Sequence, residues 1–229
     1  MSLRDAVFKT GPIPPLEATR ATKKRYSELL SQQLAIEVGE GLRRVGFSNV
    51  KPSRTDSKET AIHGGLGPKK IDVCYSDERH GLLLAVSIKT INFPEFGKNL
   101  RNRFADLCTE AITLHMRFPY SVVCALFGFP KGADLDITNG RKISTFRRAM
   151  RLFATISGRE DYTDPAEKFE NVTMLLYDTV SKYSGDLNLS IFDAISERAL
   201  TETEYFRMVL NLYNKRNPHA PIGLKGVDW

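Results

Sequence analysis

The amino-acid sequence predicts an α/β fold in which a mixed central sheet is flanked by helices on both faces. Segments with helical periodicity alternate with short apolar runs, in the order helix, strand, strand, helix, strand, helix, strand, strand, helix. Such an alternation is typical of layered α/β domains. The length of 229 residues and the 41% share of hydrophobic residues suit a single domain over residues 1–229 with a sizeable core.

The predicted helices carry apolar side chains at steps of three and four. They cover residues 16–44, 99–117, 142–157 and 201–215. The second of them has the cleanest stripe, which runs from Leu100 through Leu107 to Phe118. Gly46 follows the first helix, as expected of a left-handed C-terminal cap.

Short apolar runs predict the strands. They cover residues 70–75, 82–89, 121–129, 171–177 and 188–193. The run over 82–89 is nearly all apolar, which favours a central position in the sheet. Residues 1–15 end in a group of prolines and are expected to form an irregular arm, whereas 51–70, rich in Gly, Ser, Thr and Lys, is expected to be a mobile basic loop.

The net charge of +6 is concentrated in the N-terminal part of the chain. Residues 1–70 hold 13 lysines and arginines against 7 acidic residues, whereas the rest of the chain holds 20 of each. A basic face attracts polyanions such as nucleic acid. A solvated surface without a ligand is the alternative interpretation.

Cysteine usage indicates a reducing compartment. Cys74, Cys108 and Cys124 are isolated in apolar surroundings, without the paired spacing of a zinc site, and are expected to be buried free thiols. No apolar run approaches the roughly 18–20 residues that span a bilayer, and the N-terminus lacks the apolar segment of a signal peptide. We therefore expect a cytoplasmic protein with no membrane partner.

One pair of residues carries a sharp chemical signal. Asp72 and Lys89 lie on two strand-like runs separated by the polar turn SDERHG, so a hairpin would bring their side chains to the same end of the sheet. A carboxylate and an ammonium placed together suit metal-assisted cleavage of a phosphodiester. An ordinary cross-strand ion pair is the alternative. A lysine that ends a continuous apolar strand is nevertheless unusual, because lysine is seldom buried without a partner.

With the helices on either side of it, this region resembles the PD-(D/E)xK nuclease superfamily, which includes many restriction endonucleases. The resemblance covers about residues 16–130 and is carried by LAIEVGEGLRRVGF, KKIDV, LLAVSIKT and SVVCALFGFP. It implies a restriction-endonuclease-like fold, in which Asp72 holds a metal ion and Lys89 positions the attacking water.

The chain departs from the family pattern at Ser87, which stands where the second strand has an acidic residue. It resembles in this respect a subgroup of restriction endonucleases that carry Ser-x-Lys and recruit a Glu from the following helix, with an Arg seven residues before it. Arg103 and Glu110 have that spacing. The resemblance therefore implies Glu110 as the second metal ligand, with Asp106 as the other candidate.

Other positions are assigned more loosely. The family's Glu on the first helix maps onto Glu37, at the edge of the buried face, where a carboxylate is costly unless it is paired. Lys69 and Lys70 precede Asp72 and, like Arg103, are candidates for contacts with a nucleic-acid backbone. The glycines at 64, 65 and 67 either let the backbone approach a phosphate or simply form turns. His115 is expected to be structural, with a partner nearby in the sequence.

The resemblance implies a Mg²⁺-dependent DNA endonuclease of restriction or phage-defence type, with Mn²⁺ as a substitute metal. Its partner would be double-stranded DNA. Cutting both strands needs two sites, so a homodimer is expected, with the last third of the chain supplying the dimer surface or base-reading elements. The alternatives are a nucleic-acid-binding module that has lost the chemistry, as Ser87 suggests, and a nuclease for RNA or damaged DNA.

Overall fold

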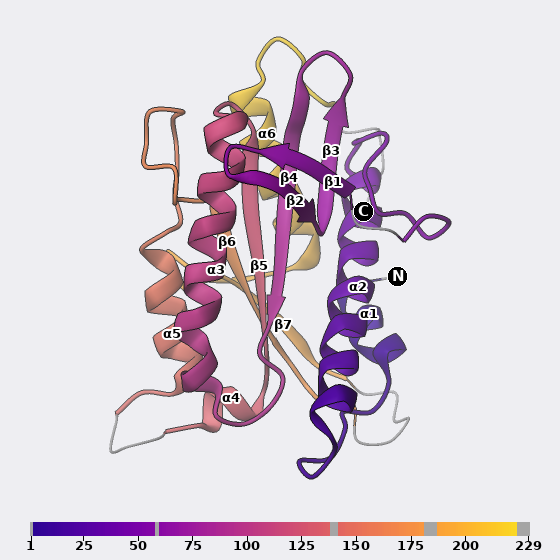
Figure 1. The fold of residues 1–229 in the computed structure, drawn as a ribbon, viewed down its shortest axis with the longest axis vertical. Helices are drawn as coiled ribbons and strands as arrows, with labels where there is room; N and C mark the ends of the chain where they lie inside the picture. Colours follow the sequence, from indigo (N-terminus) through magenta and orange to yellow (C-terminus); the bar gives the residue numbers. More distant parts are fainter. Residues whose placement is uncertain (1, 58–59, 138–141, 181–186, 224–229) are drawn as a thin grey trace.

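Figure 1 shows the computed structural model of the chain, which describes residues 2–57, 60–137, 142–180 and 187–223. Its helices are α1 (Leu3–Thr10), α2 (Arg20–Arg44), α3 (Phe96–Arg117), α4 (Gly132–Leu135), α5 (Thr145–Ala154) and α6 (Glu202–Arg216). Its strands are β1 (Thr60–Gly64), β2 (Gly67–Ile71), β3 (Val73–Asp77), β4 (Gly81–Thr90), β5 (Val122–Pro130), β6 (Asn171–Tyr177), β7 (Leu189–Asp193) and β8 (Ala199–Leu200). The predicted α/β class is confirmed.

The main sheet has six strands in the order β3-β4-β5-β6-β7-β8. The central strands β4, β5 and β6 are parallel, whereas β3 pairs antiparallel with β4, and β6, β7 and β8 pair antiparallel in turn. The sheet is therefore mixed, as predicted. Parallel neighbours require crossover connections, and the segments that contain α3 and α5 supply them between β4, β5 and β6.

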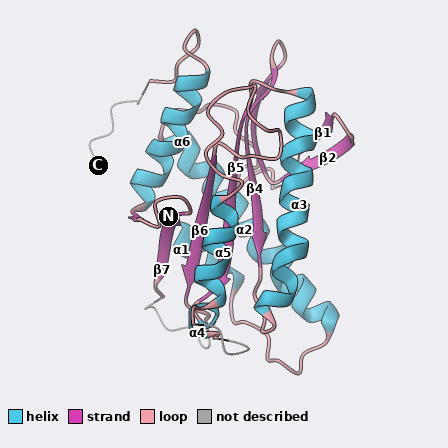
Figure 2. Cartoon of the chain, turned by 90° about the vertical axis from the view of Figure 1, so that its left-hand side faces the viewer, coloured by secondary structure: helices cyan, strands magenta, loops and turns pink. Residues whose placement is uncertain are grey.

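Helices cover both faces of this sheet (Figure 1, Figure 2), which confirms the prediction. On one face α1, α2 and α6 share an apolar cluster with the strands, in which Leu34 of α2 and Val86 of β4 take part. On the other face α3 and α5 form a second cluster, with Leu107 of α3 and Ala85 of β4. Because successive side chains of a strand point to opposite faces, the apolar run in β4 contributes to both clusters.

The expectation of an irregular N-terminal arm was wrong for residues 3–10, which form α1. The side chain of Ser2 accepts a hydrogen bond from the Asp5 amide at 3.4 Å, and the Asp5 carboxylate accepts one from the Ser2 amide at 2.7 Å. This reciprocal arrangement is a capping box. Leu3 and Val7 bury one face of the helix in the core. Two turns are too short for periodicity to be visible, but the capping pattern was a usable signal.

The expectation of a mobile loop over residues 51–70 was also wrong for residues 60–70. Residues 60–71 form an antiparallel hairpin of β1 and β2, whose turn at residues 65–66 leads into Gly67 with a φ of +121°. The predicted strand over 70–75 is split at Asp72, which lies between β2 and β3. The hairpin packs on α3, since a Cβ atom on Gly64 would lie 2.4 Å from Cγ2 of Thr113. Close packing against a helix, rather than against a phosphate, explains this glycine.

A close approach between α2 and α6 gives a first prediction about stability. A Cβ atom on Gly41 would lie 1.9 Å from Cζ of Phe206, so Gly41→Ala forces a buried ring to move. We expect a loss of about 1–3 kcal/mol in the free energy of unfolding, as for other overpacked cores. Gly132→Ala, where no atom lies within 4 Å of the added Cβ, is the matched control. Urea denaturation of the two variants measures the difference, and equal stability would contradict the packing described here.

All three cysteines lie in the described part of the chain. Cys74, Cys108 and Cys124 are free thiols, of which the first and last are buried and Cys108 is half-buried. Burial raises the pKa of the Cys124 thiol, so it stays protonated at neutral pH. Across the described ranges, no helix combines the length and apolar character needed to cross a bilayer.

Candidate active site

The hairpin of β3 and β4 brings Asp72 close to Lys89. The antiparallel register pairs Val73 with Val86, so Asp72, just before β3, lies beside the last residues of β4. Its Oδ2 atom accepts a hydrogen bond of 2.7 Å from the Ile88 amide, which fixes the carboxylate at the sheet edge. The Nζ atom of Lys89 lies 3.5 Å from the same oxygen.

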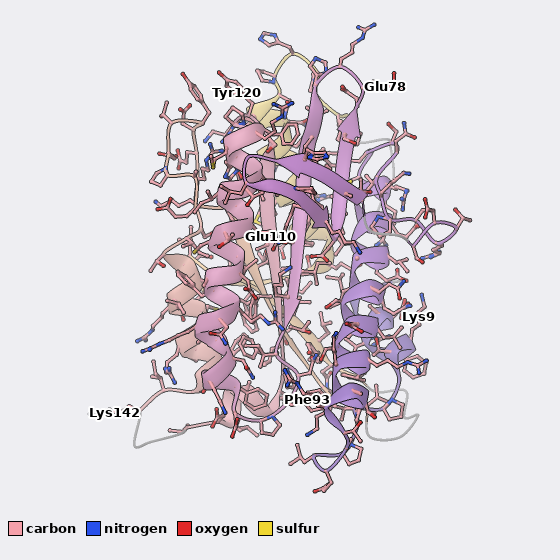
Figure 3. The ribbon with its side chains drawn as sticks, viewed as in Figure 1. Lys9, Glu78, Phe93, Glu110, Tyr120 and Lys142 are labelled. Carbon is pink, nitrogen blue, oxygen red and sulfur yellow. The ribbon has the colours of Figure 1, made fainter. Side chains whose placement is uncertain are left out.

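Helix α3 adds a second carboxylate to this pair. Glu110 lies next to Ala111 of the apolar stripe, and packing of that stripe on the sheet turns Glu110 towards β4 with only 3% of the residue exposed (Figure 3). Its Oε2 and Oε1 atoms lie 3.1 and 3.4 Å from Nζ of Lys89. The structure therefore brings Asp72, Lys89 and Glu110 together around one ammonium group, and their chemical roles stay predictions.

Glu110 has a second cationic neighbour on the β1–β2 hairpin. Nζ of Lys69 lies 3.0 Å from its Oε1 atom. Lys69, which was predicted to contact nucleic acid, thus forms an ion pair with Glu110, the predicted metal ligand. The Oε2 atom, despite its 3.1 Å distance from Lys89, lacks hydrogen-bond geometry to that ammonium. Among the described residues this buried oxygen accepts no hydrogen bond. An unsatisfied buried carboxylate oxygen is costly and calls for an additional cation or donor.

The charge of Lys89 is set by these neighbours. Burial lowers the pKa of its ammonium, but the nearby carboxylates of Asp72 and Glu110 outweigh the burial and hold that pKa above its ordinary value. Lys89 is therefore a cation at neutral pH. In this state it can stabilise negative charge and orient a water molecule, and it cannot accept a proton.

Three other predicted residues take different positions. Ser87 lies two residues before Lys89 on the same face of β4 and is 1% exposed. Asp106 is on the outside of α3, where its Oδ2 atom is 3.0 Å from Nη1 of Arg103. Between the two candidates for the second acidic residue, the geometry therefore favours Glu110 over Asp106.

Glu37 was predicted to support the site, but the structure pairs it with residues outside the site. Its carboxylate is 1% exposed, with Oε1 2.5 Å from Nζ of Lys9 on α1 and Oε2 3.3 Å from Nη2 of Arg54. Among the described residues, its partners are thus Lys9 and Arg54, and the structure does not join it to Lys89. Its burial was correctly inferred from the helical pattern, but its partners come from segments expected to be irregular.

Asp72 and Lys89 lie in a cleft of about 1290 Å³. Its lining residues come mainly from α2 and from the end of β4, with Arg103 from α3; Figure 1 shows α2 and α3 on either side of the end of β4. It forms there because β3 pairs with β4 only as far as Val73, which leaves the end of β4 without this antiparallel neighbour. Seven basic residues contribute to its lining: Arg20, Lys23, Lys24, Arg25, Lys70, Lys89 and Arg103.

The four basic residues of α2 were not singled out from the sequence. The run RATKKR at the start of the predicted helix was a usable signal, because Arg20, Lys23 and Lys24 share one face at helical spacing. The sequence reveals the excess of charge in this part of the chain. It does not reveal that this face of α2 borders Asp72 and Lys89.

Comparisons of the chain with protein-family models, with curated proteins and with solved structures found no match. The resemblance to the nuclease superfamily therefore rests on the sequence motifs and on the geometry of Asp72, Lys89 and Glu110. Among the described residues, no group of three or more His, Cys, Asp or Glu side chains is arranged to hold a metal ion. A metal at this site would have two carboxylates as its side-chain ligands.

Proposed function

We propose that the chain is a metal-dependent endonuclease that hydrolyses phosphodiester bonds in DNA, with a restriction-endonuclease-like arrangement of its sheet and helices. The observation that carries the proposal is the convergence of Asp72, Lys89 and the buried Glu110 around one ammonium group, where Asp72 and Lys89 line a cleft with basic walls. A basic cleft attracts a polyanion. The two carboxylates and the ammonium supply the groups that metal-assisted hydrolysis requires.

The residues at the site fit Mg²⁺, with Mn²⁺ as a substitute. Magnesium prefers oxygen ligands and is often bound by one or two carboxylates, with water and substrate phosphate completing its shell. Asp72 and Glu110 would hold it, and the buried Oε2 atom of Glu110, which accepts no hydrogen bond among the described residues, is a ready ligand. Bound there, the metal would supply charge stabilisation and an activated water. Lys89 would then orient that water and stabilise the charge of the phosphate.

Two further parts of the proposal concern the oligomeric state and the compartment. Cleavage of both strands of a duplex needs two sites, so we propose a homodimer, with the last third of the chain as the source of its interface or of base-reading elements. The free thiols suit a reducing cytoplasm.

The test is a plasmid-nicking assay with Mg²⁺ or Mn²⁺, repeated with a chelator. We expect metal-dependent cleavage by the wild-type protein, and a loss of about 10²-fold or more in Glu110→Gln, as when one stabilising group is removed from an active site. Asp106→Asn, on the outside of the same helix, is the matched control and should cut at the wild-type rate. Equal rates in the two variants, or cleavage that survives the chelator, would overturn the proposal.

A specific observation favours a second candidate function, a nucleic-acid-binding module without chemistry. Ser87 removes one carboxylate from the site, and Lys69 and Lys89 already neutralise Glu110 without a metal. This candidate predicts salt-sensitive binding of nucleic acid that is unaffected by Asp72→Asn and by a chelator, together with no cleavage of DNA, RNA or damaged DNA by the wild-type protein.

A further inference from the structure

One face of α2 forms a continuous wall of the cleft. The residues of this helix that line the cleft include Arg20, Lys23, Lys24, Ser27, Glu28, Ser31, Gln32 and Ala35. Their alternating steps of three and one place these residues on one half of the helix circumference, and Arg25 and Leu29 extend the lining beyond it. At a rise of 1.5 Å per residue this face is about 22 Å long. Leu30 and Leu34, which belong to the core, border this face along one of its edges. We call the cleft-lining face from Arg20 to Ala35 the α2 stripe.

The position of the α2 stripe is fixed relative to the proposed active site. The side chain of Asn92, just after β4, donates hydrogen bonds to Ser27 at 2.8 Å and to Thr90 at 2.9 Å, and accepts one from Tyr177. Tyr177 and Asn92 are buried, so this network resists local movement. It holds the first third of α2 against the end of β4, close in sequence to Lys89.

Charge is distributed unevenly along the α2 stripe. Basic side chains gather at the first turns, where Lys23 lies over the ring of Phe93 at 5.5 Å from its centroid. Beyond them the stripe presents the neutral side chains of Ser27, Ser31 and Gln32. The one acidic residue, Glu28, pairs with Lys24 at 3.5 Å on the exposed surface.

The cations of the α2 stripe oppose the electrostatics of their own helix. The N-terminal end of a helix carries a partial positive charge that favours acidic residues, yet the first turn of α2 has none. Arg20, Lys23 and Lys24 add positive charge to that end instead. Such an arrangement is unfavourable in isolation and becomes favourable when an anion binds the same surface.

We propose that the α2 stripe is the path of one nucleic-acid strand through the cleft, with Arg20, Lys23 and Lys24 bound to its phosphates on one side of the bond to be cut. The neutral part of the stripe, further along α2, contacts the strand through hydrogen bonds. Contacts of this kind position the backbone without reading its sequence. This inference rests on the proposed function, because the strand is the substrate of the site at Asp72 and Lys89.

The test measures the binding of a fluorescently labelled DNA oligonucleotide by anisotropy, with a chelator present, at a series of salt concentrations. Each lysine–phosphate contact contributes about 0.7–0.9 to the slope of log K against log salt. For Arg20→Gln/Lys23→Gln/Lys24→Gln we therefore expect a slope reduced by about 2–3 and weaker binding at every salt concentration. The matched control, Lys131→Gln/Arg207→Gln/Lys215→Gln, removes the same charge from exposed residues that do not line the cleft and should keep the slope.

The outcomes separate this inference from the proposed function. An α2 variant with the slope of its control overturns the strand path, even if the wild-type protein cuts DNA. A wild-type protein that does not bind the oligonucleotide overturns it as well. A reduced slope in the α2 variant supports the path, and if the wild-type protein then shows no metal-dependent cleavage, the nuclease proposal fails while the path stands as a binding surface.

Discussion

Lys89→Ala is expected to lower the rate of metal-dependent DNA cleavage by about 10²–10³-fold, the effect of removing one group that stabilises developing charge. In the structure Lys89 is the cation shared by Asp72 and Glu110. Its loss leaves the two carboxylates without this neighbour, so their attraction for a divalent cation should rise. We therefore expect the variant to bind Mn²⁺ at least as tightly as the wild-type protein, while cutting far more slowly.

Two measurements check this expectation. Single-turnover cleavage gives the rate, and titration with Mn²⁺ gives the affinity of the metal, each compared with Lys98→Ala, an exposed lysine at the start of the same α3 that carries Glu110. Weaker Mn²⁺ binding together with slow cleavage would show that Lys89 acts through the fold of the site. Cleavage at the wild-type rate would remove Lys89 from the mechanism altogether.

The raised pKa of Lys89 also bears on the chemical role of its side chain. Because the carboxylates of Asp72 and Glu110 outweigh burial and hold this pKa above its ordinary value, the ammonium stays protonated through the neutral range. A lysine that acted as a general base would need a lowered pKa. Within the proposed nuclease, Lys89 would therefore stabilise charge and orient water rather than act as a general base.

The meeting of Asp72 with Lys89 could be predicted because it depends on local rules. Two strand-like runs joined by a polar turn form a hairpin, and the hairpin fixes which residues lie at its open end. Placing Glu110 required more, namely the helical stripe of α3 and the spacing from Arg103. The stripe determines which side of the helix faces the sheet, and Glu110 lies on the flank of that side.

The partners of Glu37 and Glu110 could not be predicted in the same way. Lys9 reaches Glu37 from α1, and Lys69 reaches Glu110 from the β1–β2 hairpin. Both segments were expected to be irregular, because two turns of helix and a glycine-rich hairpin carry little periodicity. Their position depends on packing against α2 and α3, which are distant in the sequence. Tertiary contacts of this kind leave no local pattern.

A second charged cluster lies at the other end of the sheet, where Glu170 precedes β6. Its Oε1 atom is 2.9 Å from Nη1 of Arg159 and 3.1 Å from Nη2 of Arg216. Its Oε2 atom accepts a hydrogen bond of 2.7 Å from the Val123 amide and lies 3.6 Å from Nε2 of His115. The expected structural role of His115 fits this position, although its partner is remote in the sequence. Glu170 and Arg159 are almost completely buried.

The pH dependence of this cluster follows from the pKa of Glu170. Burial alone would raise that pKa, but His115, the Val123 amide and Arg159 together hold it below its ordinary value of about 4.3. A carboxyl group with a lowered pKa in the folded state stabilises the protein above its unfolded-state pKa. That contribution is lost as the pH falls through the folded-state pKa. It should therefore be complete at neutral pH and decline below about pH 4.

Glu170→Gln is expected to destabilise the fold by about 3–5 kcal/mol at pH 7, because it leaves two buried or nearly buried arginines without their carboxylate partner. The glutamine preserves shape and can still accept the Val123 hydrogen bond, so the loss reports the charge itself. Urea denaturation of the variant and of Glu160→Gln, an exposed glutamate 3.7 Å from Lys215, gives the comparison, and the control should unfold like the wild-type protein.

The difference between Glu170→Gln and wild type should shrink as the pH falls below about 4, since the wild-type carboxyl group then becomes protonated. A difference that stays constant down to pH 3 would mean that the packing of this side chain, rather than its charge, holds the end of the sheet together.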